Sequence, residues 1–307
     1  EGWWNNSANP FCTKFDNTDL ESAIYAHFLS NQLGLDIDDA AQAISWAFEC
    51  YEKGLITKED TDGLELVWGN FEAMIEMLRK LAYREGFGDF LADGAVRAAE
   101  KLGKDSWKFV IHVKGQDSLD GVRINKGWGF GVILSPVGGR HLRGSLGGFW
   151  LGGDKPVNSY EDVPEKIYMG QQLKAVQDIL GYCSYVYGLD FDDWVAIAVA
   201  AIDPSLSKEK LLHAGLQAHN LEKAFNTIHA GFDRKDDYPC YRYYNEPVKS
   251  GPYKDERLGH NEWDRMLDEH YQLHKWDAKT SLQTREGLLE IGLPEVADKL
   301  DRVMKLL

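Results

Sequence analysis

The sequence lacks the features of secreted and membrane proteins. Its four cysteines are too few for a disulfide framework in 307 residues and too widely spaced for a C-x-x-C metal knuckle. No apolar run approaches the roughly 18 residues of a membrane-spanning helix, and no signal-peptide pattern is present. We therefore expect a cytoplasmic location and no membrane span.

Positive charge is also scarce. Lys and Arg number 34 against 49 Asp and Glu, which gives a formal net charge of −15. Non-specific binding to nucleic acid or to an anionic membrane needs an excess of cations, so neither is an expected partner. Walker A, H-E-x-x-H, G-x-S-x-G and isolated dinucleotide-binding patterns are absent, which leaves those reaction classes without support.

Apolar residues recur at helical spacing through most of the chain. With a hydrophobic content of 44% and ten tryptophans, this pattern predicts a folded protein, and the length allows two domains. Helices are expected at 20–33, 36–53, 71–84, 89–102, 168–180, 191–202, 207–231, 261–274, 281–291 and 294–306, and residues 57–60 resemble a capping box that opens a short helix. The alternating segment 107–113 predicts one strand, and glycine-rich 115–153 predicts a loop and a domain boundary.

The run D-x-x-G-Y-C at 178–183 closes a predicted helix and ends on a lone thiol. Residues 31–36 repeat its frame of a polar residue, then glycine, an apolar residue and Cys or Asp. A glycine there permits a left-handed turn and a close ligand approach, and the acid can accept hydrogen bonds from an amino-substituted ring. Two ordinary helix C-caps, which the spacing favours, and one shared ligand both fit. A second repeat aligns residues 34–39 with residues 188–193. The sequence alone does not show which of the two alignments reflects a repeated structure.

Three further segments could carry chemistry. The run G-G-R-H-L-R-G at 138–144 offers either a proton donor with anion-binding arginines or a basic turn paired with surface carboxylates. Cys12 lies in a Pro-Phe-Cys-Thr loop, where a reactive thiol and a partly buried structural thiol both fit. Cys183 alone is more typical of a small buried hydrophobe than of a metal ligand, and we assign Cys50 and Cys240 to structure.

Together these segments resemble the aldehyde ferredoxin oxidoreductase family, whose members hold tungsten or molybdenum on two pterins beside a 4Fe–4S cluster. The resemblance covers 31–36, 54–56, 66–69, 113–115, 138–143, 178–183, 236–239 and 291–297. It implies a mainly α fold of two helical domains, the family's domains 2 and 3, at 1–117 and 118–307. The chain begins without Met, so we expect the family's β-rich amino-terminal domain and three cluster cysteines to precede residue 1.

The resemblance also implies roles for individual residues. The expected pterin-binding residues are Asn31, Gly34, Leu35, Asp36, Arg143, Asp178, Gly181 and Tyr182. Asp178 and Asn31 would hydrogen-bond the pterin edges, with Asn31 standing where the family usually has Asp. Cys183 would be the fourth ligand of the 4Fe–4S cluster, and His141 would donate a proton near the metal. A Mg²⁺ ion between the pterin phosphates would complete the cofactor.

Cys12 bears on the reaction. The triplet at 11–13, Phe-Cys-Thr, stands where aldehyde-oxidising members tend to have Tyr-Glu-Thr, whose glutamate is placed as a general base. A thiolate is a soft ligand that could bind tungsten, while the carboxylate that would activate water is missing. This looks like the tungsten-dependent class II benzoyl-CoA reductase branch. The leading prediction is a catalytic subunit that passes electrons through the cluster to tungsten and reduces an aromatic acyl-CoA to a cyclic dienoyl-CoA without ATP.

Two alternatives stay open. One is an aldehyde oxidoreductase of the same family, which makes a carboxylate and passes electrons to ferredoxin. The other is a non-catalytic helical subunit that keeps the scaffold without the metal. For either enzyme, the expected partners are a ferredoxin-like electron-transfer subunit in an oligomeric complex and the preceding portion of the same subunit.

Overall fold

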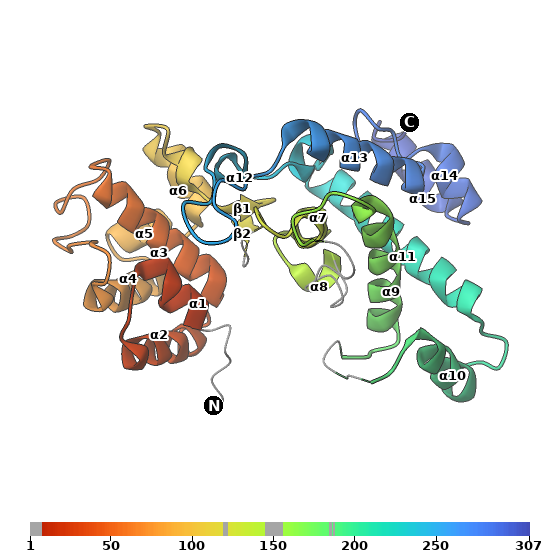
Figure 1. The fold of residues 1–307 in the computed structure, drawn as a ribbon, viewed down its shortest axis with the longest axis horizontal. Coiled ribbons are helices and arrows are strands. Elements are labelled where there is room, and N and C mark those ends of the chain that lie inside the picture. Colours follow the sequence, from red (N-terminus) through yellow and green to blue (C-terminus); the bar gives the residue numbers. More distant parts are fainter. Residues whose placement is uncertain (1–7, 119–121, 145–155, 184–185, 187) are drawn as a thin grey trace. The chain divides into compact units, whose positions relative to one another are not determined.

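Helices make up most of the part of the chain that the structure describes (Figure 1). The computed structural model describes residues 8–118, 122–144, 156–183, 186 and 188–307. The chain divides into two compact units: unit 1 is Glu1–Leu119 with Cys240–Arg242, and unit 2 is Asp120–Pro239 with Tyr243–Leu307. No helix in these described ranges is long and apolar enough to cross a membrane. The mainly α fold predicted from the sequence is confirmed.

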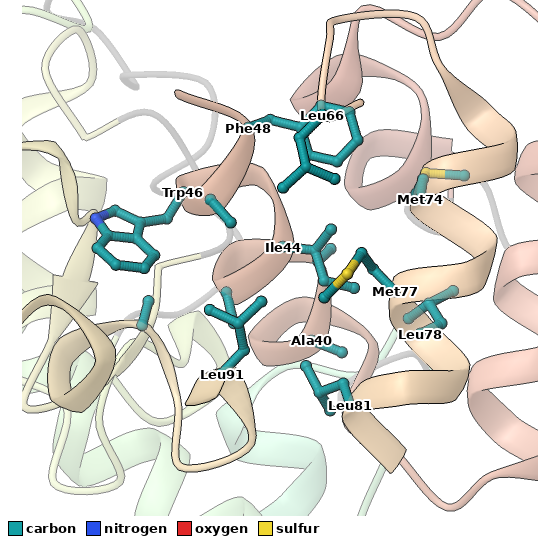
Figure 2. Packing of buried hydrophobic residues seen from close by; sticks show 14 of the residues in the cluster. Ala40, Ile44, Trp46, Phe48, Leu66, Met74, Met77, Leu78, Leu81 and Leu91 are labelled. Atoms are coloured by element: carbon teal, nitrogen blue, oxygen red, sulfur yellow. The ribbon is translucent and has the colours of Figure 1, made fainter. Parts of the chain in front are cut away.

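Unit 1 is built around helix α3. Its elements are α1 (Ala8–Phe11), η2 (Thr13–Phe15), α2 (Leu20–Gln32), α3 (Ile37–Glu52), α4 (Phe71–Tyr83), α5 (Phe87–Leu91), α6 (Ala95–Leu102), η3 (Ser106–Phe109), β1 (His112–Val113) and β2 (Gln116–Asp117). Ala40, Ile44 and Phe48 recur every four residues along α3 and are buried. Figure 2 shows Ile44 facing Met77 of α4. This core fixes the start of α3, next to the first sequence motif.

The strand predicted at 107–113 is wrong for most of its length. Its first residues belong to the 3₁₀ helix η3, and only His112–Val113 pairs, antiparallel, with Gln116–Asp117. Lys114 and Gly115 between the strands have φ of 53° and 88°, as a two-residue type I′ hairpin turn requires. A β-strand is stable only when it pairs with another strand. In the described part of unit 1 the available partner is the two-residue strand β2, so β1 is equally short.

Two predicted helices of unit 1 also differ from the structure. The segment 89–102 is divided between α5 and α6, because Gly94 between them has φ of 91° and interrupts the right-handed helix. Residues 57–60 form a turn instead of a helix. The Thr57 backbone N–H donates to Asp60 Oδ2 at 2.8 Å, as in a helix cap, but Gly63 soon takes φ of 86° and the chain turns away.

Unit 2 packs helices α11 and α13 against α9. Its elements are α7 (Lys126–Ile133), α8 (His141–Gly144), α9 (Val163–Ile179), α10 (Phe191–Ala201), α11 (Lys208–His229), η5 (Arg234–Asp237), α13 (His260–His274), α14 (Arg285–Glu290) and α15 (Pro294–Arg302), while α12 (Tyr241–Asn245) has residues of both units. A Cβ on Gly215 of α11 would lie 2.4 Å from the Gln172 carbonyl oxygen of α9. A glycine there lets α11 approach α9 closely.

The glycine-rich segment predicted as a loop contains a buried helix, α7. Asn125 begins it by accepting a hydrogen bond from the Trp128 N–H at 3.0 Å. A Cβ on Gly129 would lie 2.7 Å from the Val122 Cβ, so this glycine serves packing rather than a turn. The buried Lys126 donates to Glu256 Oε2 at 3.0 Å and also to two backbone carbonyls, which compensates its charge.

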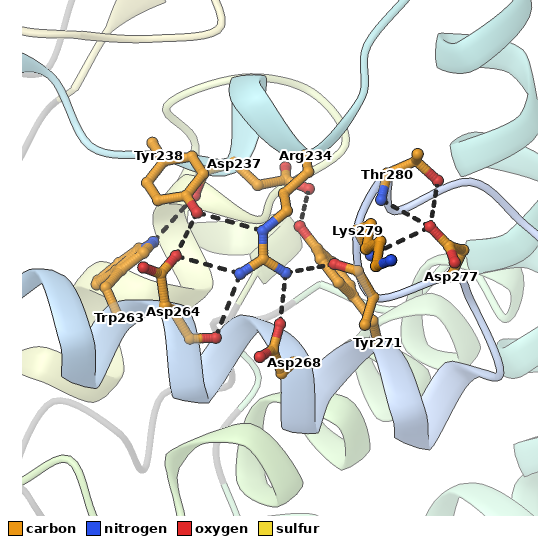
Figure 3. Close-up of polar contacts among 11 residues, drawn as sticks. Arg234, Asp237, Tyr238, Trp263, Asp264, Asp268, Tyr271, Asp277, Lys279 and Thr280 are labelled. Atoms are coloured by element: carbon orange, nitrogen blue, oxygen red, sulfur yellow. Dashed lines mark hydrogen bonds and ion pairs between the residues drawn. The ribbon is translucent and has the colours of Figure 1, made fainter.

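An arginine joins η5 to α13 (Figure 3). Arg234 Nη1 donates to Asp268 Oδ1 at 2.6 Å and Nη2 to Asp264 Oδ1 at 3.2 Å. Its guanidinium also lies over the Tyr271 ring, 5.5 Å from the centroid. The Tyr271 hydroxyl donates to Asp237 Oδ2 at 2.8 Å, so the end of η5 is tied to the same helix. These contacts hold the polar interior of unit 2 in one arrangement.

Candidate functional site

The first sequence motif is the C-terminal cap of α2. The Gly34 N–H donates to the Asn31 carbonyl at 3.2 Å, and the Leu35 N–H donates to the Ser30 carbonyl at 2.9 Å. Gly34 has φ of 69°, a left-handed conformation that glycine adopts without strain. Leu35 then packs its half-buried side chain against the core of unit 1. Asn31 and Gly34 remain exposed at the helix end.

The second motif ends α9 with the same hydrogen bonds. The Gly181 N–H donates to the Asp178 carbonyl at 3.1 Å, and the Tyr182 N–H donates to the Gln177 carbonyl at 3.0 Å. Gly181 has φ of 70°, within a degree of its counterpart in unit 1. The same two hydrogen bonds and a positive-φ glycine also close α3 at Gly54 and α14 at Gly292, so the two motifs share a common helix C-cap and are set apart by their sequence frame.

The second sequence repeat, 34–39 with 188–193, also corresponds to a repeated local structure. The Asp36 carboxylate begins α3 by accepting hydrogen bonds from the backbone N–H groups two and three residues further on, both at 3.0 Å. Asp190 begins α10 in the same way, at 2.9 and 3.0 Å. Both registers are thus real, one as a repeated C-cap and the other as a repeated N-cap. In unit 1, Gly34 belongs both to the C-cap of α2 and to the segment that leads into the N-cap of α3. In unit 2, Gly181 belongs to the C-cap of α9 and Gly188 to the segment before the N-cap of α10.

A charged cluster surrounds Asp178 in unit 2. Arg143 of α8 donates to Asp178 Oδ2, and Lys174, one turn earlier on α9, donates to Oδ1. The Arg143 guanidinium also pairs with Glu222 of α11. The structure thus brings together the sequence-predicted Arg143 and Asp178. Lys174 and Glu222 were missed, although a lysine four residues before an acid on a predicted helix is a visible signal.

His141 and Cys183 occupy separate places in unit 2. The half-buried His141 ring lies 4.9 Å from the Trp128 ring of α7, centroid to centroid. Cys183 is exposed, and its carbonyl accepts a hydrogen bond from the Val186 N–H at 3.0 Å. The neighbouring Tyr182 hydroxyl donates to the Val186 carbonyl at 3.1 Å. The Cys183 thiol therefore lies at an accessible turn and is not the small buried hydrophobe that its residue type alone favours.

Cys12 lies in unit 1, in a loop that is firmly held. Its carbonyl accepts hydrogen bonds from the Phe15 N–H at 3.2 Å and the Asn17 N–H at 2.9 Å. Burial, and then the negative charge of Asp19, raise the pKa of the Cys12 thiol. The free thiol is therefore protonated at neutral pH, and metal binding at Cys12 would release a proton. Among the described residues, no group of three or more His, Cys, Asp and Glu side chains is arranged to hold a metal ion.

Each motif contains a glycine that local packing does not require. A Cβ built on Gly34 or Gly181 would meet nothing within 4 Å among the described residues. Each Asp178 oxygen holds one cation and keeps a further lone pair, because an ionised carboxylate offers about four acceptor sites. The exposed Asn31 amide offers a donor and an acceptor. These groups fit the hydrogen-bonding edge of a pterin.

Comparison with known proteins decides the family. The model for "aldehyde ferredoxin oxidoreductase, domains 2 & 3" matches residues 7–293. The chain belongs to the aldehyde ferredoxin oxidoreductase family. This membership confirms the resemblance inferred from the motifs and the prediction of the family's two helical domains.

Relatives within and around this family differ in what their names state. The chain is 32% identical to the tungsten-containing aldehyde ferredoxin oxidoreductase of Pyrococcus furiosus, over 90% of this chain and 46% of that protein. It is 28% identical to an aliphatic sulfonate oxidoreductase, WOR-like subunit, of the same organism, over 93% and 45%. A solved structure, the active-site complex BamBC of benzoyl coenzyme A reductase with 1,5-dienoyl-CoA, shares the fold with a TM-score of 0.75 at 20% identity, over 97% of this chain and 50% of that chain. The chain thus spans about half the length of these relatives.

Proposed function

We propose that the chain holds a tungsten or molybdenum bis-pterin and takes part in an oxidoreductase reaction. The observation that carries this proposal is the family membership, and it is supported by the two sequence motifs, one in each unit, and by the cations that hold Asp178. Unit 1 would bind one pterin at Asn31, Gly34, Leu35 and Asp36, and unit 2 the other at Asp178, Gly181 and Tyr182. The bound metal supplies two-electron chemistry.

The chain's own residues would orient that cofactor and manage protons. Asp178 and Asn31 hydrogen-bond the pterin edges, and Arg143 contacts a pterin or its phosphate, where a Mg²⁺ ion completes the charge balance. Cys183 is one ligand of a 4Fe–4S cluster, in keeping with its exposed position. His141 holds a proton on a ring nitrogen and delivers it near the metal.

For the substrate, the proposal is an aromatic acyl-CoA thioester that is reduced by two electrons to a cyclic dienoyl-CoA. Cys12 supports it, because a thiol stands where aldehyde hydration needs a carboxylate base. The side chain of Asp19, the acid whose charge acts on Cys12, is already used to cap α2. Benzoyl coenzyme A reductase provides the substrate class by analogy. We further propose a ferredoxin-like electron-transfer subunit in an oligomeric complex as the partner.

Aldehyde oxidation to a carboxylate is the second candidate. The 32% identity to the Pyrococcus furiosus aldehyde ferredoxin oxidoreductase favours it. Activity of the natively purified complex separates the two candidates. Reduction of benzoyl-CoA by a strong low-potential reductant supports the acyl-CoA proposal. Oxidation of simple aldehydes with a viologen acceptor, while benzoyl-CoA stays unchanged, would replace it with the second candidate.

Gly181→Ala tests the second motif. Alanine at this left-handed position is expected to lower the free energy of unfolding by about 1 kcal/mol. Its methyl group also enters the space proposed for the pterin, so the bound tungsten or molybdenum should fall several-fold by elemental analysis. Gly54→Ala is the matched control, since Gly54 ends α3 with φ of 67°, the same pair of backbone hydrogen bonds and open space around it. If Gly181→Ala and its control lose the same amount of metal, Gly181 has no specific role in binding the ligand.

A further inference from the structure

The residue one helical turn before each motif contacts the polar residue that opens the motif. In unit 2, Lys174 contacts Asp178 along α9. In unit 1, Asn31 Nδ2 lies 3.2 Å from His27 Nε2 along α2 and donates to it when the imidazole proton is on Nδ1. The two contacts have the same spacing but different chemistry. A lysine accompanies the acid, and an imidazole ring accompanies the amide.

Lys174 is placed to fix one rotamer of Asp178. The Lys174 side chain is 7% exposed, so its ammonium group is held within the packed face of α9. A buried ammonium is costly unless it is paired, and among the described residues Lys174 donates to the carboxylate of Asp178. The Asp178 side chain is 31% exposed, so it would otherwise be free to turn in solvent. Lys174 therefore limits the motion of Asp178.

The position of Asp178 makes this support necessary. A carboxylate in the last turn of a helix faces the negative end of the helix dipole and the unsatisfied carbonyl groups. Asp178 lies in the last turn of α9, which ends at Ile179. Two cations, one on each carboxylate oxygen, offset that repulsion. In unit 1 the uncharged amide of Asn31 meets no such repulsion, and the contact that its side chain makes along α2 is with the His27 ring.

Glu222 completes the arrangement from a third helix. It pairs with Arg143, whose guanidinium also holds Asp178, so α8, α9 and α11 all contribute to the placement of one carboxylate. The side chains of Arg143, Glu222, Lys174 and Asp178 are between 7% and 31% exposed, so each is largely packed. An arginine held by two carboxylates keeps its planar fork fixed before any ligand binds.

We propose that Lys174 is a positioning residue that aims the Asp178 carboxylate at the pterin of unit 2, with His27 in the same role for Asn31 in unit 1. This inference rests on the proposed function. Lys174 does not touch the ligand. It keeps the two free acceptor sites of Asp178 pointed away from α9, so that binding the pterin costs less side-chain ordering.

The test uses protein purified natively from cells grown with limiting tungstate, so that metal content reports on cofactor affinity. Lys174→Met keeps the length and burial of the side chain but loses the ammonium group. We expect its tungsten and pterin content to fall roughly tenfold, as when an outer support of a metal site is lost. Lys174→Arg is expected to retain most of the cofactor. Arg265→Met, which removes an exposed i,i+4 pair with Glu269 on α13, is the matched control and should stay at the wild-type level.

A second measurement, the melting temperature, distinguishes a role of Lys174 in positioning Asp178 from a role in folding. The melting temperature of each variant purified without tungstate should stay close to that of the wild type, because methionine packs where the lysine stem did. Wild-type tungsten and pterin content in Lys174→Met would overturn the inference and leave the proposed function intact. Absence of tungsten, molybdenum and pterin from the wild-type protein itself would overturn both. If the methionine variant does not fold, Lys174→Gln carries the test alone, and full cofactor content in it likewise overturns the inference.

Discussion

Acidification below about pH 5 is expected to unfold unit 2, because three histidines are buried there as neutral rings. His219 of α11 and His270 and His274 of α13 have rings within 5.1 Å of a neighbour in the group. Neither ring nitrogen of His274 has a hydrogen-bond partner within the part of the chain that the structure describes. Burial lowers the pKa of His219 to about 3 and of His270 to about 4, and it lowers the pKa of His274 well below its usual value.

The sign of this effect follows from the proton balance. In the unfolded chain these histidines titrate near pH 6.5, whereas the folded protein keeps them neutral to a much lower pH. Stability is therefore complete above about pH 6.5 and falls as the pH decreases toward 4, where only the unfolded chain takes up the protons. With three protons the slope reaches roughly 4 kcal/mol per pH unit, which is large against a typical stability of 5–15 kcal/mol. The positive charge of Lys223 adds to the effect on all three rings.

His274→Phe separates this mechanism from general acid unfolding. Phenylalanine keeps the contacts with the Tyr168 and Trp276 rings, now 4.6 and 4.3 Å from His274, and removes one titrating group. Urea unfolding followed by tryptophan fluorescence at several pH values should show a slope lower by about one proton. His213→Phe, at an exposed position on α11, should leave the slope unchanged. An unchanged slope in His274→Phe would contradict the assignment.

Replacement of Cys12 is expected to abolish activity without unfolding the protein. Under the proposed function the Cys12 thiolate binds tungsten, and the hydroxyl of Cys12→Ser is a harder and far less acidic group. Turnover should fall by more than about a hundredfold, beyond the loss caused by changing only a supporting residue around a metal. The loop itself should persist, because its hydrogen bonds use the Cys12 carbonyl and not the thiol.

Two measurements make the Cys12 prediction specific. X-ray absorption at the tungsten edge should show one fewer sulfur neighbour in Cys12→Ser than in the wild-type protein. Under the proposed function, Cys12→Glu supplies a carboxylate that can act as a general base, so it should gain aldehyde oxidation while it loses acyl-CoA reduction. Wild-type turnover and an unchanged sulfur count in the serine variant would show that Cys12 is a structural thiol.

Local signals in the sequence were sufficient for most helices. Asp19 and Asp190 begin α2 and α10 with side-chain hydrogen bonds to the backbone, as their positions before apolar periodic segments indicate. The failure at α7 has a tertiary cause. Judged residue by residue, the glycines of α7 indicate a loop. Gly129 is instead required because Val122, which lies outside the helix, packs against it. The strand at 107–113 failed for a similar reason, since pairing depends on a partner that local sequence does not reveal.

The candidate site divides in the same way. Repetition of a short frame reveals both motifs, and the structure adds that Gly34 and Gly181 share one backbone conformation. Glu222 could not be found from the sequence, because its role depends on α11 lying beside α8 and α9. The buried histidines were missed because helical spacing of His270 and His274 does not distinguish a polar surface from an interior.

Quantification of metal and pterin in the natively purified protein that contains this chain tests the central claim most directly. If the two matching helix ends each hold one pterin, elemental analysis and oxidised-pterin fluorescence should give two pterins for each tungsten or molybdenum atom. Gly181→Ala should lower both together. A folded, natively purified protein with neither metal nor pterin would contradict the account and favour a scaffold without the cofactor.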